Sequence, residues 1–277
     1  MKANSSIKEQ NDAKKLFRKL GSCSHTFFHI LNREYGHTKR IEERASDPLA
    51  GGIYQQGYQC GMLWGASLAV GAEAFRRYED HDKAISVAIK ATQHVMESFT
   101  KRTDTIECYD ITKCDWSSKI SMAKYFFTGK FLSCFNLAEE WAPEAIDAVE
   151  EGLAKEWTDL PQECISCASE VAKKMGASDE QTVMVAGFAG GLGLSGNACG
   201  AFSAAIWMKN LDRCKKSEKS SYKDPDSDEN LEKFYAATDY EIRCDKITGR
   251  TFKTVEDHTE FIKNGGCDKI INTLSQL

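Results

Sequence analysis

The chain contains one glycine-rich segment twice, and this duplication restricts the possible folds more than any other feature. Residues 51–61 and 190–200 both read G-G-x-x-x-x-G-x-x-C-G, and the two copies are separated by half the length of the chain. Glycine makes up about 7% of residues in average proteins and cysteine is rarer, so five such matches arise by chance in about one register in a million. The sequence therefore predicts two copies of one unit, as domains of residues 1–154 and 155–277.

A second repeat, I-x-C-x-x-I-T, occurs at residues 106–112 and 242–248. The two repeats align Cys60 and Cys108 with Cys199 and Cys244, and in this register each half has four cysteines with closely similar spacing. The first set is Cys23, Cys60, Cys108 and Cys134, and the second is Cys164, Cys199, Cys244 and Cys267. Cys167 is an alternative to Cys164, although Cys164 reproduces the separation between Cys23 and Cys60 more closely. The remaining cysteines, Cys114, Cys167 and Cys214, have no counterparts and are interpreted as small buried side chains.

Composition and periodicity predict an all-α protein. There are only four prolines, 28% of the residues are charged, and apolar residues recur at helical spacing, as in residues 85–99. After the first glycine segment, Gly61, Gly65 and Ala69 form a flat stripe at i, i+4 and i+8, where another backbone can approach closely. We expect two homologous helical bundles, related by an approximate two-fold axis.

Charge and hydropathy exclude several functional classes. The net charge is −5, so the chain has no basic field that would attract nucleic acid or anionic lipid. Residues 183–208 carry no charge but contain six glycines, which predicts a buried helix–loop–helix and no membrane span. Residues 1–19 are polar and do not resemble a secretory signal, so we expect a cytoplasmic protein. In a reducing compartment, clustered cysteines hold metal or carry out redox chemistry more often than they form disulfides.

Four thiolates that meet at one place suit an iron–sulfur cluster or a tetrahedral zinc ion. Successive cysteines of each set lie far apart in the sequence, so each must come from a different element of a folded bundle. The glycine segments predict that Cys60 and Cys199 begin helices, where free N–H groups favour a thiolate. The glycines expected to let the backbone approach a cofactor are Gly57, Gly61, Gly196 and Gly200.

These motifs resemble a family of redox-active proteins named for four dispersed cysteines, one of them in a Cys-Gly-Ala-x-x-Gly motif. Residues 60–65 keep the last glycine of that motif, and residues 199–204 keep its alanine. A similar domain occurs in split-Soret cytochrome c. The resemblance spans the chain as a tandem duplication and implies helical domains with four redox-active cysteines, and an iron–sulfur centre by analogy with the cytochrome. The chain has no C-x-x-C-H sequence, so it does not bind c-type haem.

Three functions remain open from the sequence. The first is an iron–sulfur protein with a 2Fe–2S or 4Fe–4S cluster, one or two per chain, that transfers electrons or serves as a reductase component. The second is a metal-free thiol–disulfide oxidoreductase or redox sensor, for which Cys164 and Cys167 form a candidate dithiol at a helix start. The third is a zinc-stabilised interaction module. The expected partners are a redox protein or a small oxidant, with a homo-oligomer as a further possibility.

Two other features allow more than one interpretation. His25 and His29 share a helix face and could bind metal, although surface or core histidines are the commoner case. The polar segment of residues 215–230 is interpreted as an exposed linker or a local insertion. The first glycine segment carries Tyr54 where the second has Gly193, which predicts that the two sites have unequal properties.

Overall fold

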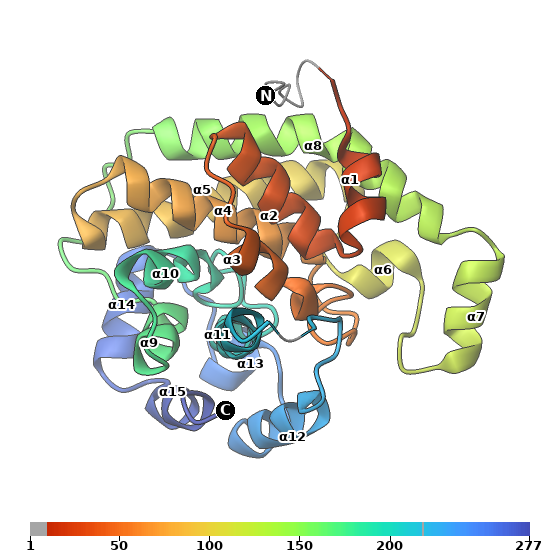
Figure 1. Cartoon of the computed structure of the whole chain (residues 1–277). Coiled ribbons are helices and arrows are strands. Elements are labelled where there is room, and N and C mark those ends of the chain that lie inside the picture. Colours follow the sequence, from red (N-terminus) through yellow and green to blue (C-terminus); the bar gives the residue numbers. More distant parts are fainter. Residues whose placement is uncertain (1–9, 218) are drawn as a thin grey trace.

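The structure, a computed structural model, describes residues 10–217 and 219–277, so the first nine residues of the expected first domain lie outside it. Within these ranges the chain forms fifteen α-helices and two 3-10 helices. It forms no strand there, and its β-type pairing consists of two isolated bridges. The all-α prediction is therefore confirmed. In Figure 1 the helices of the first half lie in the upper part of the molecule and those of the second half lie below them.

The helices of the first half are α1 (Ala13–Leu20), α2 (Cys23–Glu34), α3 (Arg40–Ala45), η1 (Asp47–Leu49), α4 (Gly61–Arg77), α5 (His81–Thr103), α6 (Cys108–Thr112), α7 (Lys119–Phe127) and α8 (Phe131–Ala154). Those of the second half are α9 (Cys167–Lys174), α10 (Asp179–Met184), η2 (Ala186–Phe188), α11 (Gly200–Lys215), α12 (Ser227–Ala237), α13 (Cys244–Thr248), α14 (Val255–Lys263) and α15 (Asp268–Leu274). From α2 onward, each element of the first half has a counterpart in the second half, in the same order.

Corresponding hydrogen bonds show that the two halves share one backbone conformation. The N–H group of Cys60 donates to the carbonyl of Ile106 at 2.7 Å, and that of Cys199 donates to Ile242 at 2.9 Å. Each half thereby joins its glycine segment to its second cysteine motif through a single antiparallel bridge. The repeat found in the sequence is thus a structural repeat.

The glycine segments are tight loops that only glycine-rich sequences can form. In both loops the seventh residue donates its N–H to the carbonyl of the first at 2.9 Å, as Gly57 does to Gly51. Gly52 and Gly191 have positive φ angles. A Cβ on Gly52 would overlap the backbone of Tyr58, and a Cβ on Gly191 would overlap that of Asn197. Each loop leads directly into the central helix of its half, α4 or α11.

The two halves interlock through their short helices. Helix α3 of the first half packs on α11, and α10 of the second half packs on α4. At one contact the Asn210 side chain donates to the carbonyl of Ala45 at 2.9 Å. At the equivalent contact Gly71 takes the place of the asparagine and lies directly against the backbone of Met184. The approximate two-fold relation is therefore built into the core, since each central helix is covered by a helix from the other half.

One hydrophobic core runs through both halves. Trp64 of α4 packs edge-on against Phe188 of the second half, with ring centroids 4.7 Å apart. The predicted small-residue stripe is confirmed, because a Cβ on Gly65 would overlap the carbonyl of Ser24 in α2. Residues 183–208 form the expected buried helix–loop–helix. In the described ranges, no helix is both long and apolar enough to cross a membrane.

Candidate functional site: two sets of four cysteines

The first set of cysteines lines a single cavity of about 330 Å³. Cys23 is the first residue of α2, Cys60 is the N-cap of α4, Cys108 is the first residue of α6, and Cys134 lies in the first turn of α8. Three of the four thiols therefore sit at helix N-termini, where unpaired N–H groups and the helix dipole stabilise negative charge on sulfur.

Hydrogen bonding makes Cys23 the thiol of this set that ionises most readily. The Cys60 thiol donates to Cys23 and the backbone N–H of Gly51 also points at Cys23, so the pKa of Cys23 is lowered although burial opposes this. The pKa of Cys60 is raised by the same hydrogen bond and by burial. The first glycine loop thus donates to sulfur, as the sequence suggested, but it does so through Gly51.

Two aromatic side chains supply further donors to the first set. The Tyr125 hydroxyl lies 3.2 Å from Cys134 Sγ. The Trp116 indole Nε1 is buried without a hydrogen-bond partner and lies near Cys108, whose pKa it lowers slightly. Burial dominates both thiols, raising the pKa of Cys134 to about 11 and that of Cys108 further still.

Aromatic side chains make up much of the remaining wall of the first cavity. It includes Phe17, Trp116, Tyr125, Phe126, Phe131 and Phe135. Tyr222, from the polar segment of the second half, completes it and binds the carbonyl of Gly21 through its hydroxyl. The interpretation of residues 215–230 as a purely exposed linker is therefore wrong at Tyr222, because this ring is half-buried over the first set of cysteines.

The second set of cysteines comes from the equivalent elements. Cys167 and Cys244 are the first residues of α9 and α13, and Cys199 and Cys267 are the N-caps of α11 and α15. Their thiols lie near enough for each to affect its neighbours, so that Cys244 interacts electrostatically with the other three. Burial, reinforced by these neighbours, raises the pKa of Cys199 to about 12 and raises those of Cys244 and Cys267 further.

Cys167 occupies the position that the spacing had assigned to Cys164. Ser166 caps α9 as Ser22 caps α2, so Cys167 follows its cap as Cys23 does. The N–H of Gly190 points at Cys167 in the same way as Gly51 points at Cys23. The gap to Cys199 is shorter because α9 has 8 residues and α2 has 12. The Ser-Cys dipeptide shared by both helix starts is the sequence signal that would have identified Cys167.

Three cysteines remain outside the two sets. Cys164 lies between α5 and α14, where Thr259 donates to its sulfur at 3.8 Å. Cys214 accepts from Arg44 Nε at 3.4 Å. Cys114 is fully buried beside Ser121, close to the first set. All eleven cysteines are free thiols.

The four glycines proposed from the sequence have structural roles around the sulfurs. A Cβ on Gly61 would lie 2.5 Å from Cys23 Sγ, and a Cβ on Gly200 would overlap the carbonyl of Phe188. The carbonyls of Gly57 and Gly196 accept the N–H groups of Tyr109 and Asp245, one residue after the third cysteine of each set. These glycines hold the cysteine-bearing segments together.

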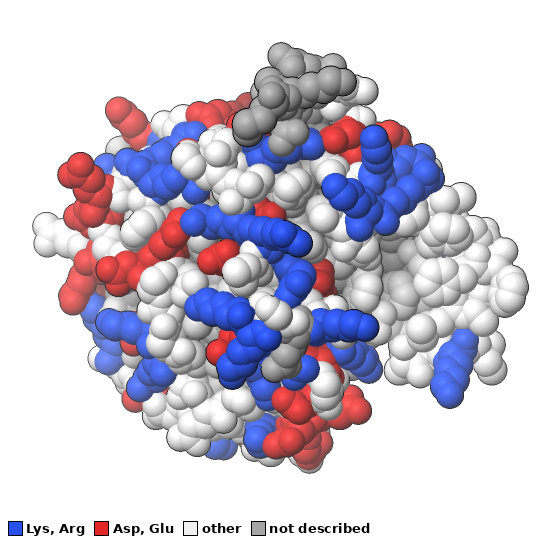
Figure 2. Space-filling view, in the orientation of Figure 1, with Lys and Arg blue, Asp and Glu red and all other residues white. Residues whose placement is uncertain are grey.

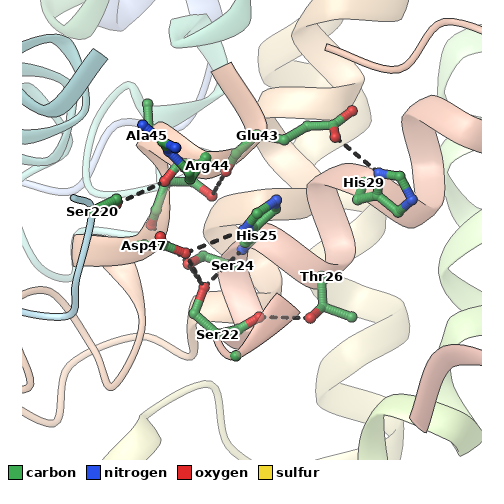
Figure 3. Close-up of polar contacts among 12 residues, drawn as sticks. Ser22, Ser24, His25, Thr26, His29, Glu43, Arg44, Ala45, Asp47 and Ser220 are labelled. Carbon is green, nitrogen blue, oxygen red and sulfur yellow. Dashed lines mark hydrogen bonds and ion pairs between the residues drawn. The ribbon is translucent and has the colours of Figure 1, made fainter. Parts of the chain in front are cut away.

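The two histidines near Cys23 are bound to carboxylates (Figure 3). His29 Nδ1 lies 2.9 Å from Glu43, and His25 Nδ1 lies 3.4 Å from Asp47. Asp47 also accepts from the cap residue Ser22 at 2.7 Å. This network fixes the start of α2 and thereby the position of Cys23.

The first cavity fits a polynuclear cluster by its donor set. Four thiols surround it, and the buried Trp116 N–H lacks a partner that a cluster sulfur would provide. No three Cys, His, Asp or Glu side chains in residues 10–217 and 219–277 surround one point as the ligands of a single metal ion do. In a 4Fe–4S cluster each cysteine binds a separate iron, and in a 2Fe–2S cluster two cysteines bind each iron, so in both the four ligands stand farther apart than around one zinc.

An apolar surface lies next to the first cavity. Its exposed side chains are Ile120, Phe126, Phe127 and Leu132, of which Phe127 is 92% exposed. In Figure 2 the lobe that contains α7 is mostly free of charged side chains, whereas Lys and Arg cover much of the centre of this face. Phe126 also lines the cavity, so the patch is continuous with the cysteine site. Exposed apolar patches of this kind typically mark interaction sites.

The fold and the sites define a class: an all-helical protein with two internally repeated sets of four cysteines. The chain matches the family model described as "Putative redox-active protein (C_GCAxxG_C_C)" over residues 22–147 and 163–277. The two matches cover most of the chain, so it belongs to this family as a tandem duplication. No curated protein and no solved structure matches it.

The family description spells the motif as Gly-Cys-Ala-x-x-Gly, so the matches to the expected form are wrong: the alanine of the motif falls at Gly61 and Gly200, and its last glycine at Trp64 and Ser203. In this chain Gln59 and Ala198 precede the central cysteines, and Gly61 and Gly200 follow them. Because Gly61 and Gly200 both lie directly against neighbouring atoms, the small residue after the cysteine is the part of the motif that the packing requires.

Proposed function

We propose that this chain is an iron–sulfur redox protein in which each half binds a cluster through its four cysteines. The ligands would be Cys23, Cys60, Cys108 and Cys134 in the first half, and Cys167, Cys199, Cys244 and Cys267 in the second. A bound cluster would accept and release single electrons. The observation that carries this proposal is the cavity that all four first-half thiols line, together with the buried, unpartnered indole N–H of Trp116, which lines the same cavity.

The chain's own residues prepare these sites for a negatively charged group. Helix N-termini and the loop N–H groups of Gly51 and Gly190 direct positive charge at the sulfurs. Burial keeps water away and raises the pKa of every thiol in the two sets except Cys23, so a metal would displace their protons on binding. The apolar patch beside the first cavity supports a redox partner protein as the electron donor or acceptor.

The test is metal analysis of protein purified without oxygen, with the visible spectrum before and after dithionite. We expect iron and acid-labile sulfide in matching amounts, with a band that dithionite bleaches. Cys167→Ser should remove the iron and sulfide bound by the second half, whereas Cys164→Ser, in the same short segment, should leave the iron and sulfide content unchanged. Protein that lacks iron and sulfide under these conditions would disprove the proposal.

Metal-free thiol–disulfide chemistry is the second candidate, and one observation favours it. The hydrogen bond from Cys60 to Cys23 pairs a readily ionised thiol with a second thiol, as in a dithiol that oxidises reversibly. This function predicts a mass loss of two protons on oxidation of the metal-free protein, with Cys23 and Cys60 joined. Stoichiometric zinc without any redox response would instead indicate an interaction module.

A further inference from the structure

The second cysteine motifs of the two halves correspond residue by residue in the register that pairs Cys108 with Cys244. Ser118 caps α7 and Thr254 caps α14 through their side chains. After these helices, the backbone N–H of Lys130 donates to the carbonyl of Tyr125 at 3.1 Å. The equivalent bond, from residue 266 to the carbonyl of Phe261, measures 3.0 Å. The correspondence therefore holds from the third cysteine to the turn before the fourth.

This register pairs Trp116 with Phe252 and Tyr125 with Phe261. In each half the two rings contact each other with centroids 5.1 Å apart. The aromatic pair is thus retained in both halves. What differs is the polar group, because the indole N–H and the phenol O–H of the first half have no equivalent on the two phenyl rings of the second.

The lost groups are those that reach the sulfurs. The Tyr125 hydroxyl lies 3.2 Å from Cys134 Sγ, and the Trp116 indole, whose buried N–H has no hydrogen-bond partner, lines the same cavity as Cys108. Hydrogen bonds to a ligating sulfur stabilise the more negative, reduced state of an iron–sulfur centre and raise its reduction potential.

Charge next to the cysteines does not separate the halves in one direction. Asp245 and Asp268 follow Cys244 and Cys267 and add to the effect of burial on the adjacent thiols, but Asp245 is paired with Arg243 at 2.9 Å. In the first half Glu107 precedes Cys108, where Arg243 precedes Cys244 in the second half. The polar groups of the two rings therefore carry the comparison between the sites.

We propose that the two sites form an ordered redox pair, in which the first site has the higher reduction potential because the Tyr125 hydroxyl donates to Cys134 and the free Trp116 N–H is available to donate to a sulfur of a bound cluster. This inference rests on the proposed function. When one electron is supplied to protein with both sites oxidised, it resides at the first site. If it enters at the second site, that site is reoxidised as the first is reduced, and no proton or further reactant is required.

The experiment is a potentiometric titration of the anaerobic protein, followed by its visible spectrum. The wild type should show two waves. The double variant Trp116→Phe, Tyr125→Phe should move the upper wave down by at least about 59 mV, a tenfold change in a one-electron equilibrium, and leave the lower wave in place. Phe261→Tyr should raise the lower wave. Tyr240→Phe removes an exposed hydroxyl elsewhere and should change neither.

Two results would overturn the ordering: a single wave in the wild type, or an upper wave that the double variant leaves in place. If the protein carries no iron, the proposed function fails but the ordering is still measurable. Metal-free protein would then be equilibrated in glutathione buffers and its cysteines mapped by mass spectrometry. Donors that stabilise thiolates favour the reduced form, so the first set should stay reduced where the second is already oxidised. The reverse order, or no difference, would contradict the inference.

Discussion

In the first half an indole and a phenol face two of the four sulfurs, whereas in the second half two phenyl rings occupy the same register positions. The backbone around both sets is nevertheless the same, down to the bridge that joins glycine loop and second cysteine motif. Duplication has thus preserved the elements that position the thiols. The two copies have instead diverged in the side chains that set charge and hydrogen bonding at sulfur.

The halves also differ in how each is covered by the other. Tyr222 of the second half lies over the first cavity. The second glycine loop is instead held by α5 of the first half, where Gln93 donates to the carbonyl of Gly193 at 3.1 Å. Tyr54, which stands where the second loop has Gly193, binds Asp224 through its hydroxyl at 2.7 Å. The tyrosine thus ties the first loop to the second half.

The largest difference in stability between the halves is expected at the glycine after the central cysteine. A Cβ on Gly200 would overlap the carbonyl group of Phe188, whereas a Cβ on Gly61 would meet the Cys23 thiol and lie 2.8 Å from the Ala50 Cα, a milder overlap with the backbone. We expect Gly200→Ala to lower the free energy of unfolding by about 3 kcal/mol and Gly61→Ala by about 1–2 kcal/mol. Urea unfolding measures both, and equal losses would show that the two positions are equivalent.

The second effect is a pH dependence confined to the second half. His258 is buried and its pKa is lowered to about 4, while the first half has Met122 at the same register position. Below pH 6.5 His258 binds a proton in the unfolded chain but stays neutral in the folded chain. The free energy of unfolding therefore falls as the pH drops toward 4.

We expect a loss of about 2 kcal/mol between pH 7.5 and pH 5 from His258, and His258→Met should remove it. Urea unfolding of both proteins at both pH values provides the comparison. A wild type that loses no more stability than the His258→Met variant between these pH values would contradict the prediction.

The interlock between the halves gives a smaller effect. Asn210→Ala removes the hydrogen bond to the buried carbonyl of Ala45 and should cost about 1–3 kcal/mol. Asn136→Ala, at a side chain that binds an exposed lysine, should cost less than about 0.5 kcal/mol. Unfolding midpoints in urea would show whether the asparagine stabilises the contact between α3 and α11.

The smallest change in stability is expected at the residue that covers the first cavity. Tyr222→Ala should cost less than about 1 kcal/mol, since the ring is half-buried and its hydroxyl binds one carbonyl. It should nevertheless speed alkylation of the first-half cysteines several-fold and leave the second set unchanged. Mass spectrometry of partially alkylated protein measures this, and uniform rates would mean that the ring does not protect the site.

The sequence alone determined the repeat, the helical class and the helix starts at the central cysteines. These features are local or periodic: glycine is required at Gly52 and Gly191, where the loop backbone folds back too closely for a Cβ, and apolar spacing marks helices. The membership of the first cysteine set also followed from the two repeated motifs, since they place Cys60 and Cys108 in one register.

Tertiary structure decided what depends on approach between distant segments. It selected Cys167 over Cys164, because the shorter α9 changes the spacing while the cap residue keeps the geometry. It packed α3 of the first half on α11 of the second, and α10 of the second half on α4 of the first. It also brought Tyr222 over cysteines that belong to the other half of the chain. Spacing in sequence carries no information on such contacts, since they are set by how complementary side chains pack in one shared core.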